Sequence, residues 1–231
     1  MTLVYIPGLL SDGRVWRAVA DRVGGAFAIA DMEGPDSIAG MAAAVLATVA
    51  GPVLPVGHSM GGRVAMEMAR IAPERMRGLV LADTGHHPLA DGERAARAAK
   101  VALGHRDMAA LVDAWLPPMV GPDRQEDAAL MADLRQMAMA AGPERHARQI
   151  AALVGRPDAA PGLRAVRVPV LLLVGAADCW SPRAQHDEIA AMLPDARVVE
   201  IAGAGHFLPV EKPRETATAI RDWLAARGLT S

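Results

Sequence analysis

Residues 55–62 read Pro55-Val56-Gly57-His58-Ser59-Met60-Gly61-Gly62, the stretch of this chain that most strongly indicates its fold. An apolar run too short for a helix precedes it, and a segment with helical spacing, residues 63–71, follows it. A Gly-x-Ser-x-Gly pattern between a strand and a helix is typical of a nucleophile elbow. Glycines on either side of the serine permit so sharp a turn, in which the central residue is strained. We therefore expect Ser59 to present its hydroxyl at the end of a strand; a glycine-rich turn without function is the simpler alternative.

Short apolar runs that stop at glycine, proline or aspartate recur on both sides of this motif. They predict strands near residues 3–6, 26–30, 53–56, 79–82, 169–174 and 198–201, with amphipathic helices between most of them. Alternation of strands and helices favours a parallel sheet with helices on both faces. The sequence thus predicts an α/β fold with a mostly parallel sheet of about six strands.

The alternation stops between residues 86 and 166, where only helical patterns occur. Segments near residues 93–103, 108–116, 125–141 and 144–153 are rich in Ala, Met, Leu and Arg, and prolines and glycines separate them. An insertion at this point would lie over the carboxyl ends of the strands, where open α/β sheets place their sites. We therefore expect a core of residues 1–85 and 167–231 and an all-helical cap of residues 86–166 that shapes the substrate pocket.

Composition narrows the classes of partner. The net charge is −2 and no basic stripe or polybasic segment occurs, so we expect neither a nucleic acid nor a membrane partner. The single cysteine, Cys179, excludes an internal disulfide, and we expect it to be a buried apolar filler. No apolar run approaches membrane-spanning length and no signal-peptide pattern opens the chain, so we expect a cytoplasmic protein. The sequence leaves the oligomeric state open.

A serine nucleophile needs a base and a group that orients the base. The candidate base is His206, in a glycine-rich loop directly after the last expected strand, and the candidate acid is Asp178, just past the strand at residues 169–174. All three residues follow carboxyl ends of strands, so we expect them at one edge of the sheet. Asp83, after the strand at residues 79–82, is the rival for the acid.

Four stretches carry a resemblance to a known family: Pro7-Gly8-Leu9, residues 57–62, residues 175–178 with Pro182, and Gly203-Ala204-Gly205-His206. In these the chain resembles the α/β-hydrolase superfamily, and within it the small bacterial esterase-like hydrolases with a helical cap. The resemblance implies that Ser59 is the nucleophile, that Asp178 and His206 are acid and base, and that the backbone N–H groups of Leu9 and Met60 form the oxyanion hole.

Two departures from that family pattern are visible. Members usually begin with two further strands, so we expect a reduced sheet, and their first loop usually carries His-Gly where this chain has Pro7-Gly8. The backbone donor at Leu9 does not depend on that histidine. We expect the cap to contribute Trp115 and Met119 to the substrate pocket, together with Phe207 beside the base.

Other polar residues have simpler interpretations. We expect His58 to be structural and to point away from the nucleophile, and the pair His86-His87 to lie in a solvated loop. No neighbouring carboxylate or thiol in the sequence completes a ligand set for that pair, so we expect no metal, and the triad chemistry requires no cofactor. Three cap arginines, Arg145, Arg148 and Arg156, could steer an acidic substrate, but the interleaved Asp and Glu favour a solvated helix face.

These features together predict a serine hydrolase that cleaves carboxylic esters through an acyl-enzyme, with a small-molecule ester or acyl compound as substrate. The same fold could also support C–C bond hydrolysis, thioester hydrolysis, a lyase reaction or acyl transfer. A protein that keeps the triad only as a ligand-binding site is a third alternative.

Overall fold

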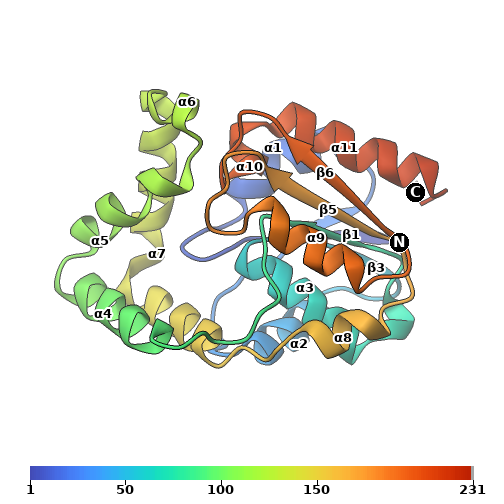
Figure 1. Ribbon diagram of the computed structural model, residues 1–231, viewed down its shortest axis with the longest axis horizontal. Helices are drawn as coiled ribbons and strands as arrows, with labels where there is room; N and C mark the ends of the chain where they lie inside the picture. Colours follow the sequence, from blue (N-terminus) through green and yellow to red (C-terminus); the bar gives the residue numbers. More distant parts are fainter. Residues whose placement is uncertain (230–231) are drawn as a thin grey trace.

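Six strands form a single parallel sheet in the computed structural model, which describes residues 1–229 (Figure 1). The strands are β1 (Thr2–Ile6), β2 (Phe27–Ile29), β3 (Val53–His58), β4 (Leu79–Ala82), β5 (Val170–Gly175) and β6 (Ala196–Ile201). Their order in the sheet is β2-β1-β3-β4-β5-β6, and every pair of neighbours is parallel. The prediction of a mostly parallel sheet of about six strands is confirmed.

Helices cover both faces of this sheet because successive strand residues point to opposite sides. In β1, Tyr5 joins one hydrophobic cluster with residues of α1 and α11, whereas Val4 and Ile6 join a second cluster with residues of α2, α3, α8 and α9. These helices are α1 (Arg14–Val23), α2 (Ile38–Thr48), α3 (Met60–Ile71), α8 (Ala160–Ala165), α9 (Arg183–Ala191) and α11 (Pro213–Ala226), and a short α10 (Leu208–Glu211) precedes the last. A sheet buried on both faces explains the continuous apolar run of β5.

Of the helices between β4 and β5, four stand apart from the sheet, beyond the carboxyl ends of its strands (Figure 1). They are α4 (Glu93–Arg106), α5 (Met108–Trp115), α6 (Pro122–Gln125) and α7 (Ala128–Val154), and we call them the cap. Helix α7 is broken at Gly142, whose φ of 73° and ψ of 167° are not helical, which agrees with the two segments expected on either side of residues 142–143. By contrast α8, which falls inside the range expected for the cap, packs against α3 of the core.

The environment of Cys179 and the lengths of the helices can be compared with the expectations from the sequence. Cys179 is exposed, so its prediction as a buried filler is wrong: it lies in the loop after β5 and its thiol faces the carbonyl of Pro118. No helix within residues 1–229 is both long and apolar enough to cross a membrane.

Candidate active site

The turn between β3 and α3 holds Ser59 in a strained conformation. Its φ is 54° and its ψ is −117°, values that side-chain-bearing residues rarely adopt. The flanking glycines are required by contact: a Cβ on Gly57 would lie 2.3 Å from the Gly61 oxygen, and one on Gly61 would lie 2.2 Å from the Ile6 oxygen. Two hydrogen bonds fix the turn, from the Ser59 N–H to the Ala82 oxygen (2.9 Å) and from the Thr84 hydroxyl to the Ser59 oxygen (2.7 Å).

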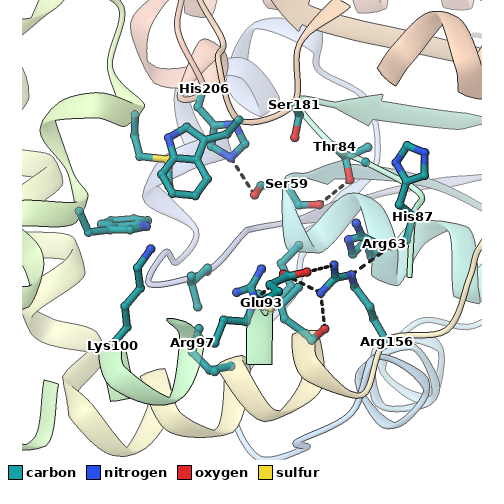
Figure 2. A pocket seen from close by; sticks show the side chains of 18 of the residues that line it. Ser59, Arg63, Thr84, His87, Glu93, Arg97, Lys100, Arg156, Ser181 and His206 are labelled. Carbon is teal, nitrogen blue, oxygen red and sulfur yellow. Dashed lines mark hydrogen bonds and ion pairs between the residues drawn. The ribbon is translucent and has the colours of Figure 1, made fainter. Parts of the chain in front are cut away.

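A continuous hydrogen-bond chain joins the three residues that the sequence singled out. The Ser59 Oγ lies 2.8 Å from His206 Nε2, and His206 Nδ1 lies 2.9 Å from Asp178 Oδ2 (Figure 2 draws the first of these contacts). With Nδ1–H donating to the carboxylate, Nε2 is free to accept the hydroxyl proton of Ser59. The geometry is that of a nucleophile, a base and an orienting acid.

Asp178 is built to remain ionised. It lies in the loop after β5, where its Oδ1 accepts hydrogen bonds from the N–H groups of Trp180 (2.8 Å) and Ser181 (3.1 Å). Burial opposes its ionisation, but the charge and hydrogen bond of His206 and the two backbone amides outweigh this effect and hold the pKa of Asp178 below its usual value. A carboxylate in this state can stabilise the imidazolium that forms when the base takes a proton.

Asp83, the rival acid, makes no hydrogen bond to His206 within residues 1–229. Its carboxylate lies fully buried and accepts from the N–H groups of Gly175 (2.9 Å) and Leu208 (3.4 Å) instead. Burial, reinforced by the neighbouring charge of Asp178, raises the pKa of Asp83 well above its usual value. Asp83 thus links the end of β5 to the start of α10 through hydrogen bonds. The carboxylate that contacts the imidazole of His206 is that of Asp178.

The two expected oxyanion donors, Leu9 and Met60, line the cavity beside Ser59. Within residues 1–229, neither backbone N–H donates to a protein acceptor, as an oxyanion hole requires. The neighbouring Leu10 has a φ of 54°, and its N–H donates to Gln149 Oε1 of α7 at 2.9 Å. No local sequence pattern indicates this bond, through which a buried side chain of the cap shapes the first loop.

His58 is structural, as expected, but it does not point away from the site. Its ring lies beside that of His206, with 5.3 Å between centroids, and its Nε2 is 2.6 Å from the His206 backbone oxygen. Burial, the largest effect, together with the nearby His206 lowers the pKa of His58 to about 3, so the ring is neutral at physiological pH. Its Nε2–H therefore donates to that oxygen and supports the backbone of the base.

Glu211, in α10, was not singled out from the sequence, yet it holds the loop of the base. Its buried carboxylate accepts three backbone hydrogen bonds, from Gly121 (2.9 Å) and Gly205 (2.9 Å) to Oε2 and from Phe207 (3.0 Å) to Oε1. In addition the His206 N–H donates to the Met119 oxygen at 2.8 Å. The loop that carries the base is thereby tied to the segment between α5 and α6.

A cavity of about 570 Å³ opens in front of Ser59, between the cap and the sheet (Figure 2). The three expected pocket residues, Trp115, Met119 and Phe207, all line it and are buried. The rings of Trp115 and Phe207 meet edge to face with 5.9 Å between centroids. Three further apolar side chains, Leu111, Ile150 and Leu153, extend this wall. The role of these residues in substrate binding stays a prediction.

Of the pair His86-His87, His87 is exposed in a loop, as expected, and also lines the cavity, whereas His86 is buried. Glu188 of α9, far away in sequence, approaches both rings, with its Oε2 3.1 Å from His87 Nε2 and 3.8 Å from His86 Nε2. One ligand atom from each of the three residues could fit around a single divalent cation, since these atoms lie within 4.8 Å of one another. The expectation that the protein needs no metal stays a prediction.

Comparison with known proteins agrees with this geometry. Residues 3–219 match the alpha/beta hydrolase family, and the chain therefore belongs to that family. A thermophilic esterase from Thermogutta terrifontis, solved with malate bound, superimposes with a TM-score of 0.90 at 26% identity, over 98% of this chain and 90% of that one. The pimeloyl-[acyl-carrier protein] methyl ester esterase of Aromatoleum aromaticum is 30% identical over 72% of this chain and 71% of its own length.

A third similarity lies within a far longer protein. The polyketide synthase ThaQ of Burkholderia thailandensis is 31% identical over 163 residues, which are 65% of this chain but only 7% of the synthase.

Proposed function

We propose that the protein is a serine hydrolase that cleaves carboxylic esters through an acyl-enzyme on Ser59. The observation that carries the proposal is the unbroken chain of hydrogen bonds from Asp178 through His206 to the Ser59 hydroxyl, which opens onto a cavity. Membership of the hydrolase family and the similarity to two esterases support the choice of an ester bond.

In the proposed reaction the Ser59 Oγ attacks the ester carbonyl while His206 Nε2 takes the hydroxyl proton. The N–H groups of Leu9 and Met60 stabilise the negative charge on the carbonyl oxygen, and Asp178 stabilises the imidazolium. His206 then donates its proton to the leaving alcohol, and the acyl group stays on Ser59. Water then attacks the acyl carbonyl while His206 takes a proton from it. The bond between the acyl carbon and Ser59 Oγ breaks, His206 returns the proton to Oγ, and the acid is released.

The decisive experiment combines labelling and kinetics. A fluorophosphonate should modify the wild-type protein at Ser59, located by peptide mass spectrometry. Ser59→Ala should no longer be labelled, and its turnover number for p-nitrophenyl butyrate should be about 10⁵–10⁶-fold lower than that of the wild type. Ser181 lines the same cavity without a hydrogen bond to His206, so Ser181→Ala should keep the label. Wild-type turnover by folded Ser59→Ala would refute the assignment.

The early time course separates reactions that pass through an acyl-enzyme on Ser59 from a lyase reaction and from ligand binding alone. An acyl-enzyme whose hydrolysis is slow releases a burst of p-nitrophenolate equal to the amount of enzyme. A lyase forms no acyl-enzyme and should show neither a burst nor the covalent acyl adduct. A protein that only binds ligands should show no turnover across a panel of esters.

A further inference from the structure

The cavity in front of Ser59 is unusually rich in cationic side chains, which come from the cap and its edges and from α3 of the core. Arg63 of α3, Arg97 and Lys100 of α4, and Arg156 after α7 line the cavity, and Glu93 is its only carboxylate within residues 1–229. His146, which also lines the cavity, stays neutral because burial and neighbouring cations lower its pKa to about 4. The Lys, Arg and Glu side chains that line the cavity thus sum to a formal charge of +3, in a protein whose formal net charge is −2.

Glu93 is fully engaged by two of the four cations. Arg156 forms a two-pronged ion pair with it, with distances of 2.9 and 2.6 Å, and the Arg97 Nε lies 2.6 Å from its Oε1. Burial opposes ionisation, but these hydrogen bonds, and one from the Ala90 N–H, lower the pKa of Glu93 to about 2. The single carboxylate is therefore ionised, and its oxygens already face Arg97 and Arg156.

Arg63 and Lys100 have no such partner. Within residues 1–229, no carboxylate lies within 4.0 Å of either side chain: Arg63 donates to the His87 oxygen (2.9 Å), and the Lys100 ammonium lies 5.1 Å from the ring centre of Trp180. Burial and nearby arginines lower both pKa values, that of Arg63 to about 9. Unpaired cations facing a cavity are the groups that a bound anion would satisfy.

We propose that Lys100 binds an anionic group on the substrate, a carboxylate or a phosphate, separated from the scissile ester by an apolar spacer; Arg63 lies farther along the cavity, beside His87 and Arg156 (Figure 2). The inference rests on the proposed ester hydrolysis at Ser59. Figure 2 shows Ser59 and His206 on one side of the cavity and Lys100 and Arg97 on the other. The apolar side chains Leu111, Ile150 and Leu153 line the same cavity and would contact the spacer.

Paired esters that differ only in this charge test the site. The p-nitrophenyl monoesters of adipate and suberate would be compared with the same esters whose free carboxylate is replaced by a primary amide. Charged hydrogen bonds contribute enough to favour the carboxylate in kcat/KM by about 10- to 100-fold. Added salt should reduce this preference, because it screens the charges. A ratio near one, with the amide esters still hydrolysed, would overturn the inference and leave the proposed function standing.

Substitution of the cation identifies the residue responsible. Lys100→Met should remove most of the preference for the carboxylate ester, and Lys100→Glu should reverse it. The matched control is Lys212→Met, because Lys212 is the only other lysine of the chain and lies outside the cavity. An unchanged ratio in folded Lys100→Glu would refute the role of Lys100.

A binding measurement decides the question independently of catalysis. Suberate and hexyl phosphate, each at millimolar concentration, should raise the melting temperature of the wild type and of Lys212→Met but not that of Lys100→Glu. The larger shift identifies whether carboxylate or phosphate is preferred. If neither anion stabilises the wild type more than it stabilises Lys100→Glu, the cations serve only to join cap and core, and the inference fails even if every ester is cleaved.

Discussion

Glu211 offers the sharpest test of how the loop of the catalytic base is held. Its carboxylate accepts the N–H groups of Gly121, Gly205 and Phe207, and the last two flank His206 on either side. Glu211→Ala leaves three buried donors without an acceptor. Glu211→Gln keeps one oxygen, which can hold the Gly121 and Gly205 bonds, but turns an NH2 group toward the Phe207 N–H.

The size of the effect follows from counting donors. An unsatisfied buried polar group costs about 1–3 kcal/mol. Glu211→Ala should therefore lower the free energy of unfolding by about 3–6 kcal/mol, if water that enters the vacated space bonds to some of the three N–H groups. Glu211→Gln loses one bond and should lower it by about 1–3 kcal/mol. Because the loop carries His206, kcat should fall in the same order, alanine below glutamine below wild type.

Urea denaturation followed by circular dichroism measures both variants against a control. Glu215 is exposed in the first turn of α11 and makes no hydrogen bond through its side chain within residues 1–229. Glu215→Ala should therefore change the free energy of unfolding by at most about 1 kcal/mol. If Glu211→Ala costs no more than this control, the three bonds do not hold the loop and the reasoning is wrong.

Three further predictions concern the acid, its titration and the elbow. Asp178→Asn should lower kcat/KM for p-nitrophenyl butyrate by about 10³–10⁴-fold, and Asp83→Asn by less than about 10-fold, since only Asp178 contacts His206; the reverse order would assign the acid role to Asp83. The pKa of Asp178 is lower in the folded state than its usual 3.8, so its contribution to stability is present above that pH and is lost as the pH falls through the folded pKa. The difference in unfolding free energy between wild type and Asp178→Asn, from urea titrations, should accordingly shrink below about pH 4, and a constant difference would contradict this. Gly61→Ala should cost more than about 4 kcal/mol or abolish soluble expression, whereas Gly162→Ala, whose Cβ would meet only ordinary contacts at 3.7 Å inside α8, should be neutral or slightly stabilising in thermal denaturation.

The sheet and the triad were predictable because each depends on local sequence and one general rule. Glycine-bounded apolar runs located the strands, and parallel strands bring their carboxyl ends to one edge. That rule alone places Ser59, Asp178 and His206 at the same edge of the sheet, although His206 is 147 residues from Ser59. The sequence favoured Asp178 as the acid but left Asp83 as a rival, because both follow strands; in the structure only Asp178 contacts the imidazole of His206.

The remaining features depend on packing between distant segments, which no local pattern encodes. Gln149 and Glu188 occupy ordinary helical positions. Their partners, Leu10 and His87, are distant in the sequence. The cationic side chains of the cavity had a partial signal, since Glu93, Arg97 and Lys100 share one face of a helix. The packing of the cap on the core turns this face toward Ser59, and the sequence does not indicate that packing. Of the cap arginines expected on a solvated face, Arg156 lines the cavity instead.

The bond from the Leu10 N–H to Gln149 has a consequence for exchanging caps between members of this family. Leu10 directly follows Leu9, the proposed oxyanion donor, so the conformation of this loop is completed by a hydrogen bond to a side chain of α7. A transplanted cap would therefore change more than the shape of the pocket. A chimera whose new cap lacks an acceptor at this point would leave the Leu10 amide buried and unpaired. Cap libraries designed for new substrates should keep a glutamine, or another acceptor of similar reach, at position 149.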